Sequence, residues 1–258
     1  MTSPRKQSES HAVNLALLGY GKMGRMLSGL APQRGCRVGL VVDIDPNVQA
    51  DGAEVITEVS KEKFEGIKIN ACLDFTAPDA VVGNIERVAA VGCNIVVGTT
   101  GWHAELPRVR KIVEEASVGM VYASNFSIGM QLFYRLAQYA AEQFAQFSTY
   151  DPYLAEQHHQ FKKDSPSGTA LVIRDKIGAS YPGREISTVA LRAGYIPGIH
   201  EVGFDSEADT IELRHTARSR QGFAEGALYA ARWVVGKKGL FEFSEILPGK
   251  EAGDARSS

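Results

Sequence analysis

The sequence predicts an α/β protein with two domains: a doubly wound parallel sheet and a second, α+β domain with an open mixed sheet. Short apolar runs alternate with helical patterns over residues 13–125, and the runs are too apolar to have a face in water, as in parallel strands covered on both sides. Beyond residue 125, several segments instead alternate apolar and polar residues, which is typical of half-exposed strands. A late apolar helix pattern at 223–239 needs a sheet to cover, so we expect it to return to the first domain.

The elements follow in order. The expected strands of the first domain are VNLALL (13–18), RVGLVVDI (37–44), INACLDF (69–75), NIVVGTT (94–100) and GMVYASN (119–125), and its expected helices are 22–32, 79–92 and 104–117. The second domain opens on one long helix over 127–149, about six turns at 3.6 residues per turn. A helix over 168–179 follows, and then three strands that we expect to be antiparallel, 187–193, 199–206 and 209–218.

Composition excludes several classes of protein. The 258 residues hold 28 Lys+Arg and 30 Asp+Glu, a net charge of −2 with no basic block, so neither nucleic acid nor an anionic membrane is an expected partner. No apolar run approaches the roughly 18 residues of a membrane span, and the polar start has no secretory pattern. The cysteines (Cys36, Cys72 and Cys93) lack metal or disulfide spacing and indicate buried thiols in the cytoplasm.

A glycine fingerprint, G-x-G-x-x-G, follows the first strand. Gly19 permits the tight turn, Gly21 lets a pyrophosphate approach the backbone, and Gly24 lets the helix pack closely. The helix that starts at Lys22 and Met23 then offers free N–H groups to phosphates. A plain glycine-rich turn is the alternative, but the strand, the helix and an acid after the second strand favour a Rossmann-like dinucleotide site.

That acid is Asp43, 19 residues after Gly24, where a carboxylate can accept from a ribose 2′-hydroxyl. Asp45 competes for this role, but Asp43 directly follows the apolar run. The cofactor is therefore NAD or NADP, with NADH favoured because an acid repels a 2′-phosphate, although Lys22 could compensate. The segments Asp74–Pro78 and Gly98–Gly101, which includes Thr99 and Thr100, end two further strands, where a ribose or nicotinamide can approach the backbone. Ordinary turns are the alternative for each.

The segment EQHHQFKKDSPSGTA (156–170) carries the chemistry of the second domain. Its helix begins at Ser167, Gly168 and Thr169, whose N–H and hydroxyl groups suit a carboxylate. His158, His159 and Lys162 add hydrogen-bonding or positive groups around the same anion, which predicts a small acidic substrate. Metal binding is disfavoured because adjacent histidines point to opposite faces of a strand and no third ligand is conspicuous. A core histidine remains the alternative for either His taken alone.

This segment is similar to the signature E-x-H-H-x-x-K-x-D-x-P-S-G-T-A of the dihydrodipicolinate reductase family. GTTGW, SNFSIGM, LRAGYIPGIHEVGF and GLFEFSEIL resemble that family too, so the resemblance spans about residues 13–248. It implies NAD(P)H-dependent reduction of 4-hydroxy-tetrahydrodipicolinate, a cyclic dicarboxylate, in lysine and diaminopimelate biosynthesis. It also implies a homotetramer built through the second domain. The expected division is 13–125 with 221–248 for the dinucleotide and 126–220 for substrate binding and oligomerisation, with tails at 1–12 and 249–258.

The resemblance also implies roles for individual residues. His158 would be a proton donor or acceptor and Lys162 the proton donor, and His159, Gly168 and Thr169 would contact the substrate. The nicotinamide end would be lined by Gly98, Thr100, Ser124, Asn125 and Phe126. The chain departs from the family at Ser165, where alanine is usual, and in its shorter glycine loop, so Lys22 and Met23 correspond only loosely. Two rivals remain: another two-domain NAD(P)-dependent dehydrogenase of a small amino or dicarboxylic acid, and a non-catalytic nucleotide sensor.

Overall fold

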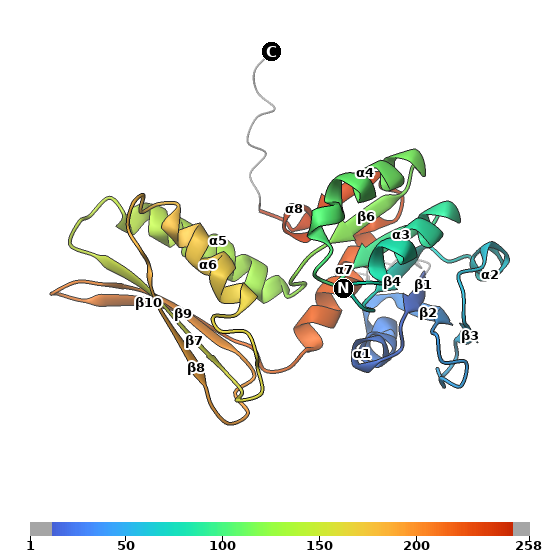
Figure 1. Ribbon diagram of the computed structural model, residues 1–258, viewed down its shortest axis with the longest axis horizontal. Coiled ribbons are helices and arrows are strands. Elements are labelled where there is room, and N and C mark those ends of the chain that lie inside the picture. The colour runs from blue at the N-terminus through green and yellow to red at the C-terminus, as the bar shows by residue number, and fades with distance from the viewer. Residues whose placement is uncertain (1–11, 250–258) are drawn as a thin grey trace, which may run out of the picture. The chain divides into compact units, whose positions relative to one another are not determined.

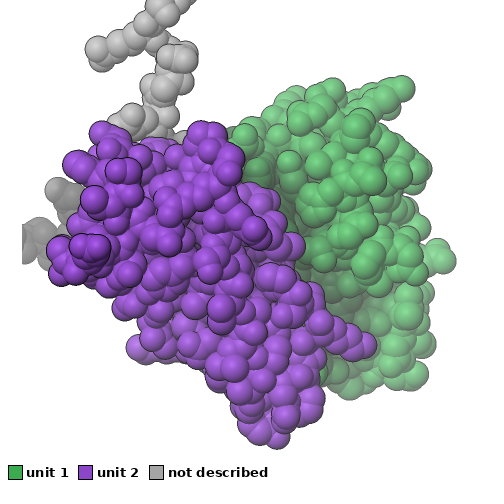
Figure 2. All heavy atoms as spheres, turned by 60° about the vertical axis from the view of Figure 1, so that its left-hand side comes forward, with its two compact units in different colours: residues 1–126, 223–258 green, residues 127–222 purple. Residues whose placement is uncertain are grey.

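The computed structural model describes residues 12–249, and its chain divides into two compact units (Figures 1 and 2). The first unit is 1–126 with 223–258, and the second is 127–222. The first boundary falls one residue beyond the expected one, and Phe126 packs on Phe243 of the same unit with ring centroids 4.8 Å apart. The second boundary falls two residues beyond the expected one. Of the predicted tails, all but Ala12 and Gly249 lie outside the described residues.

The first unit is built on a seven-stranded sheet in the order β11-β6-β5-β4-β1-β2-β3, in which every neighbouring pair is parallel. Its five inner strands are largely buried, which is why their sequences are apolar runs, whereas the edge strands β3 and β11 contain no buried residue. The order reverses between β1 and β4, which creates a crevice outside their carboxyl ends. The strands are β1 (Val13–Leu18), β2 (Cys36–Val42), β3 (Glu54–Ile56), β4 (Ala71–Asp74), β5 (Asn94–Val97), β6 (Gly119–Tyr122) and β11 (Gly239–Glu242).

Helices cover both faces of this sheet (Figure 1). One core joins the sheet to Phe64 of α2, Ile85 of α3 and Val109 of α4, while α1 and α7 lie on the opposite side. The helices of this unit are α1 (Lys22–Leu30), α2 (Lys61–Ile67), α3 (Val81–Ala90), α4 (Leu106–Glu115), α7 (Gln221–Val234) and the short α8 (Phe243–Ile246), with 3₁₀ turns at Ala31–Arg34 and His103–Glu105.

The end of α7 differs from the sequence prediction. The helix expected over 223–239 ends at Val234, and Gly236 then takes a left-handed φ of +76° that stops it. The chain continues into β11, which pairs with β6 and forms an edge of the sheet. The short elements β3, α2 and β11 were not predicted, because segments of three to seven residues carry too little periodicity to be recognised.

The second unit is a four-stranded sheet in the order β10-β9-β7-β8, with two helices on one face (Figure 1). Leu154 and Val202 of the sheet pack against Ala137 of the first helix and Ile173 of the second. The elements are α5 (Ile128–Phe144), β7 (Asp151–His158), α6 (Gly168–Gly178), β8 (Ser187–Arg192), β9 (Ile199–Asp205) and β10 (Thr210–Thr216).

Two expectations for this unit were wrong. The long helix ends at Phe144 and not near residue 149, because a turn closed by the Phe147 N–H on the Phe144 carbonyl follows it. The edge strand β8 runs parallel to β7 and not antiparallel. The reason is the crossover through α6, which returns the chain to the same end of the sheet. Strand β7 was not predicted as a strand, although it carries His158 at its end.

Candidate functional site

A cavity of about 660 Å³ lies at the carboxyl ends of β1, β2 and β4, at the point where the strand order reverses. The glycine turn after β1 and Asp43 after β2 line it, as do Phe75 and Thr76 after β4. Arg87 of α3 and Glu58 add one charge of each sign. Ligands of open α/β sheets bind at such a position.

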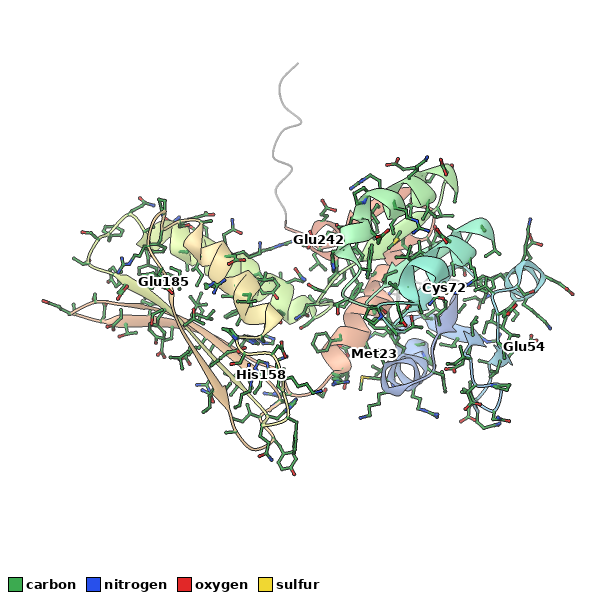
Figure 3. All side chains as sticks on the ribbon, viewed as in Figure 1. Met23, Glu54, Cys72, His158, Glu185 and Glu242 are labelled. Carbon is green, nitrogen blue, oxygen red and sulfur yellow. The ribbon has the colours of Figure 1, made fainter. Side chains whose placement is uncertain are left out.

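The three glycines of the fingerprint have distinct geometric roles. Gly19 has a φ of +81°, which favours glycine, and a Cβ on Gly24 would lie 2.5 Å from the Gly19 carbonyl oxygen. A Cβ on Gly21 would meet nothing within 4 Å, so the space beside it is open. Gly21 caps α1 without a side-chain hydrogen bond, which leaves the N–H groups of Lys22 and Met23 without a side-chain cap (Figure 3 labels Met23).

Asp43 and Asp45 are engaged differently. The Asp43 carboxylate accepts from the Tyr20 N–H at 2.7 Å and the Asp45 N–H at 3.0 Å, and it lines the cavity. The Asp45 carboxylate accepts from the Asn47 N–H at 2.9 Å and is not among the cavity residues. Asp43 is therefore the better placed of the two for a ribose, since a carboxylate can accept more than two hydrogen bonds.

The carboxylate of Asp74, which begins the segment expected near the cofactor, is buried and organises the loops after β4 and β5. Asp74 is 1% exposed and accepts from the Thr76 hydroxyl at 2.7 Å, the Asn84 amide at 2.8 Å and the Thr99 hydroxyl at 3.1 Å. The hydroxyl of Thr99, a predicted cofactor residue, thus donates to Asp74 within the protein. Burial of a charge requires such partners, so this network holds the two loops together.

The other residues expected at the nicotinamide end follow β5 and β6, and they are not part of the cavity lining. A Cβ on Gly98 would lie 2.0 Å from the Phe75 ring, so close packing requires this glycine. Thr100 and Ser124 are exposed, whereas Asn125 and Phe126 are buried.

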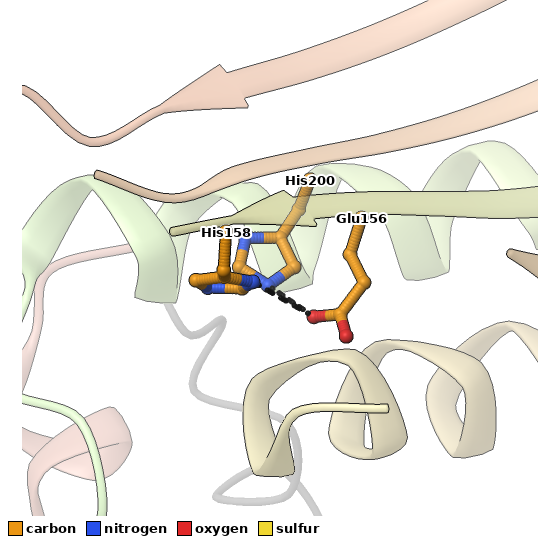
Figure 4. Close-up of side chains that lie close together, drawn as sticks. All are labelled: Glu156, His158 and His200. Carbon is orange, nitrogen blue, oxygen red and sulfur yellow. Dashed lines mark ion pairs between the residues drawn. The ribbon is translucent and has the colours of Figure 1, made fainter. Parts of the chain in front are cut away.

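The second unit concentrates its buried polar groups at the end of β7 (Figure 4). Glu156 is fully buried, and it accepts from the Ser167 N–H at 2.8 Å, from the Ser167 hydroxyl and from Arg192 at 2.7 Å. His158 Nδ1 lies 3.3 Å and His200 Nε2 lies 3.5 Å from the same Glu156 oxygen. Strands β7, β8 and β9 and helix α6 thus meet at one carboxylate.

Burial sets the charges in this cluster. It lowers the pKa of His158, against the opposing effect of Glu156. It lowers the pKa of His200 to about 4, with His158 as a further cause. Burial alone would raise the pKa of Glu156, but the hydrogen bonds from Ser167 and Arg192 hold that pKa below its usual value. At neutral pH, two neutral imidazoles therefore surround a carboxylate.

Among the described residues, Glu156, His158 and His200 are close enough to share a metal ion, so the structure supplies ligands that the sequence did not reveal. Protein groups already satisfy this carboxylate, however. One Glu156 oxygen accepts from Arg192 and the Ser167 N–H, and the other from the Ser167 hydroxyl. The guanidinium would repel a cation at that point, and the absence of a metal stays a prediction.

The loop between β7 and α6 carries Lys162. Its ammonium lies 2.8 and 3.0 Å from the two oxygens of Asp164, and Arg192 donates to the Asp164 carbonyl at 2.7 Å. The hydrogen bond from Lys162 lowers the pKa of Asp164, and the Gly168 N–H contributes too. His159 is half-buried beyond the strand end, with its ring centroid 6.1 Å from that of Phe161.

The side chains expected to form an anion pocket at the start of α6 have partners within the protein, and the pocket itself stays a prediction. The Ser167 hydroxyl caps the helix by accepting from the Ala170 N–H and donates to Glu156, so it is not free for a substrate. Thr169 pairs through its side chain with the Tyr134 hydroxyl. The missed residues are Glu156, Asp164, Arg192 and His200. The two-residue spacing of Glu156 and His158 could have placed both on one face of a strand. Arg192 and His200 lie in LRAGYIPGIHEVGF, which resembles the family, but no spacing in that segment places them beside Glu156.

Comparison with known proteins identifies the family. The N-terminal domain of dihydrodipicolinate reductase matches residues 13–126, and the C-terminal domain matches residues 129–247. The chain belongs to the dihydrodipicolinate reductase family. It is therefore an NAD(P)-dependent oxidoreductase, and the rival assignment to another two-domain dehydrogenase of a small amino or dicarboxylic acid is wrong.

The membership of this family is supported by relatives that align with nearly the whole length of the chain. A 4-hydroxy-tetrahydrodipicolinate reductase of Christiangramia forsetii is 33% identical over 91% of the chain and 98% of its own length. One of Methanoculleus marisnigri is 34% identical over 83% of the chain and 94% of its own length. The structure of dipicolinate-bound dihydrodipicolinate reductase from Paenisporosarcina sp. TG-14 shares the fold, with a TM-score of 0.80 at 24% identity, covering 91% of this chain and 99% of that one. Between residues 12 and 249, no helix has the length and hydropathy to cross a membrane.

Proposed function

We propose that this reductase converts 4-hydroxy-tetrahydrodipicolinate to tetrahydrodipicolinate with NAD(P)H, in the lysine and diaminopimelate pathway, and that the second unit holds the substrate. The names of the curated relatives support the reaction. The observation that carries the assignment of the site is the Lys162 ammonium, held beside the N-terminus of α6 and next to two neutral imidazoles. A small dicarboxylate fits a site of this chemistry.

The first unit fits a dinucleotide. The open space at Gly21 lets a pyrophosphate approach the uncapped start of α1, and Asp43 faces the same cavity for a ribose hydroxyl. Asp43 and Glu58 outnumber Arg87 in the lining, and Arg87 already donates to Asn84 at 2.6 Å, so NADH is preferred over NADPH. The nicotinamide supplies the hydride when it is bound. Its end of the site is formed by Gly98, Thr99, Thr100, Ser124, Asn125 and Phe126, with Thr99 acting through its backbone.

The reaction also releases the 4-hydroxyl group of the substrate as water and takes up one proton, and Lys162 is the source of that proton. The lowered pKa of His158 leaves that imidazole neutral at pH 7, so it serves as a hydrogen-bonding group and not as the acid. An ammonium can pair with a substrate carboxylate and deliver a proton from the same atom. Lys162, His159 and the Gly168 and Thr169 backbone at the start of α6 hold the substrate, while Ser167 positions Glu156.

The uncovered face of the four-stranded sheet supports the expected homotetramer. Val189 and Leu191 of β8 are 63% and 46% exposed and lie on the face opposite α5 and α6. Apolar groups at this spacing suit a sheet packed against another copy of the chain. The three buried, unpaired cysteines support a reducing compartment, which is the cytoplasm for this reaction.

The test uses two adjacent lysines. Lys162→Ala should lower kcat by about 10²–10⁴-fold, the usual loss when a general acid is removed. Lys163→Ala, at an exposed position that makes no ion pair among the described residues, is the matched control and should stay near wild type. The assay follows NADH and NADPH oxidation at about 340 nm, with the product of the preceding pathway enzyme as substrate. Wild-type turnover in Lys162→Ala would remove Lys162 from the mechanism, and no oxidation by the wild-type enzyme with either cofactor would refute the reaction.

A further inference from the structure

Two carboxylates face the N-terminus of α6, and the protein holds them very differently. Glu156 is fully buried and bonded to Ser167 and Arg192. The side chain of Asp164 is 55% exposed, and its partners are the Lys162 ammonium and the Gly168 N–H. Glu156 is therefore a fixed part of the fold, whereas the Asp164 carboxylate can turn into solvent.

The partners of Asp164 are the groups that a substrate carboxylate needs. The Lys162 ammonium contacts both Asp164 oxygens, at 2.8 and 3.0 Å, as it would contact the carboxylate of a bound anion. The Gly168 N–H lies in the first turn of an 11-residue helix, where the backbone favours negative charge. A substrate carboxylate on Lys162 would have to share these donors with Asp164 or replace it.

We propose that Asp164 is an internal carboxylate that occupies the place of a substrate carboxylate on Lys162 and is displaced when the dianionic substrate binds. Asp164 thereby sets the affinity of the site. The inference rests on the proposed function for the identity of the substrate, and on the structure alone for the competition.

The charge balance of the site supports displacement. Glu156 is paired with Arg192 and Lys162 with Asp164, and both imidazoles are neutral at pH 7. A dianion therefore meets balanced charges until Asp164 leaves, which exposes one ammonium. Arg192 holds the Asp164 carbonyl at 2.7 Å, so the side chain can rotate while the main chain stays anchored.

The expected effect is modest because the competing ion pair is partly exposed. Pairs of this kind are weak, so removing the charge of Asp164 should tighten substrate binding by about two- to fivefold. The gain should shrink as salt is added, because salt screens the freed ammonium. The chemical step should not change, since Asp164 has already left Lys162 when the substrate is bound.

The experiment compares three variants of the full-length enzyme. Asp164→Asn removes the charge, Asp164→Glu keeps it, and Asp175→Asn removes a 72% exposed carboxylate from α6, away from Lys162. Steady-state kinetics give KM and kcat, and calorimetry gives the Kd of dipicolinate, the ligand named in the Paenisporosarcina structure. In Asp164→Asn, we expect KM and Kd to fall about two- to fivefold with kcat within twofold of wild type. Asp164→Glu keeps the competing charge and should not bind dipicolinate more tightly than wild type, and Asp175→Asn should match the wild-type enzyme.

Several results would overturn the proposal. An unchanged or higher Kd for dipicolinate in Asp164→Asn would do so. The absence of dipicolinate binding to both the wild-type enzyme and Asp164→Asn would also do so. A lower kcat at constant KM would instead make Asp164 a positioning residue for Lys162. Calorimetry needs no turnover, so it separates the two hypotheses. A reductase without activity whose Asp164→Asn variant still binds dipicolinate more tightly refutes the reaction alone, whereas normal turnover with unchanged affinity refutes the role of Asp164 alone.

Discussion

Lowering the pH from 7 to 4 should destabilise the second unit, and His200 should account for a large part of the loss. His200 is 4% exposed, and burial lowers its pKa from 6.5 to about 4. The charged or titratable groups that act on it are His158, Glu156, His215 and Lys162. Between pH 6.5 and about 4, His200 therefore binds a proton in the unfolded chain but not in the folded protein.

The sign and size follow from this difference. Stability rises with pH wherever the unfolded state binds more protons, so the contribution of His200 is complete above pH 6.5 and is lost as the pH falls to about 4. Each tenfold change in proton affinity corresponds to about 1.4 kcal/mol, so the loss amounts to about 3 kcal/mol. His200→Gln keeps a polar atom near the Ser167 hydroxyl, which lies 3.3 Å from Nε2, but removes the titration.

The measurement is urea unfolding of both proteins at a series of pH values between about 4 and 7.5, within the window that the His200 pKa defines. Far-UV circular dichroism reports both units, while both tryptophans, Trp102 and Trp233, lie in the first unit, so their fluorescence is an internal control. The free energy of unfolding should fall by about 3 kcal/mol less in His200→Gln than in wild type. His215→Gln is the matched comparison, because burial also lowers the pKa of His215, by a smaller amount. Parallel pH curves for wild type and His200→Gln would refute the reasoning.

Three further predictions concern other contacts. Gly24→Ala should destabilise the protein by about 1–3 kcal/mol, because the added methyl group overpacks against the Gly19 carbonyl, and it should weaken NADH binding. Gly29→Ala, which has open space on the same helix, should stabilise the protein by about 0.5–1 kcal/mol. Urea unfolding that finds Gly24→Ala more stable than Gly29→Ala would contradict the packing argument. Glu156→Gln should cost about 3–5 kcal/mol in the same assay by leaving the Arg192 side chain, which is 16% exposed, without a counter-charge. A loss under about 0.5 kcal/mol, as at surface positions, would mean that the pair is dispensable. Asp43→Ala should raise the KM for NADH about tenfold or more, as the loss of a charged hydrogen bond does, with less effect on NADPH, and Asp45→Ala is the control; equal effects on both cofactors would exclude Asp43 from the ribose site.

Local patterns were sufficient for much of the architecture. Buried parallel strands must be apolar on both faces, so the runs at 13–18 and 94–100 predicted the first sheet without knowledge of any contact. The glycine fingerprint is equally local: Gly19 needs a left-handed φ and Gly24 a close approach, and both requirements lie within six residues of chain. The segment at 156–170 named the family because its motif is contiguous.

What the sequence by itself determined is therefore the class of fold and the family, and it also predicted candidate residues of the site, since each of these depends on neighbours along the chain. Only the tertiary structure decided how those residues are charged and what holds them. Arg192 and His200 reach Glu156 from strands 36 and 44 positions away, through the parallel pairing of β7 with β8 and the antiparallel pairing with β9. Burial by that packing lowers the pKa of His158, so its imidazole is neutral at pH 7. The same packing brings the Ser167 N–H within hydrogen-bond distance of Glu156. Desolvation depends on every atom nearby, and no short pattern encodes it.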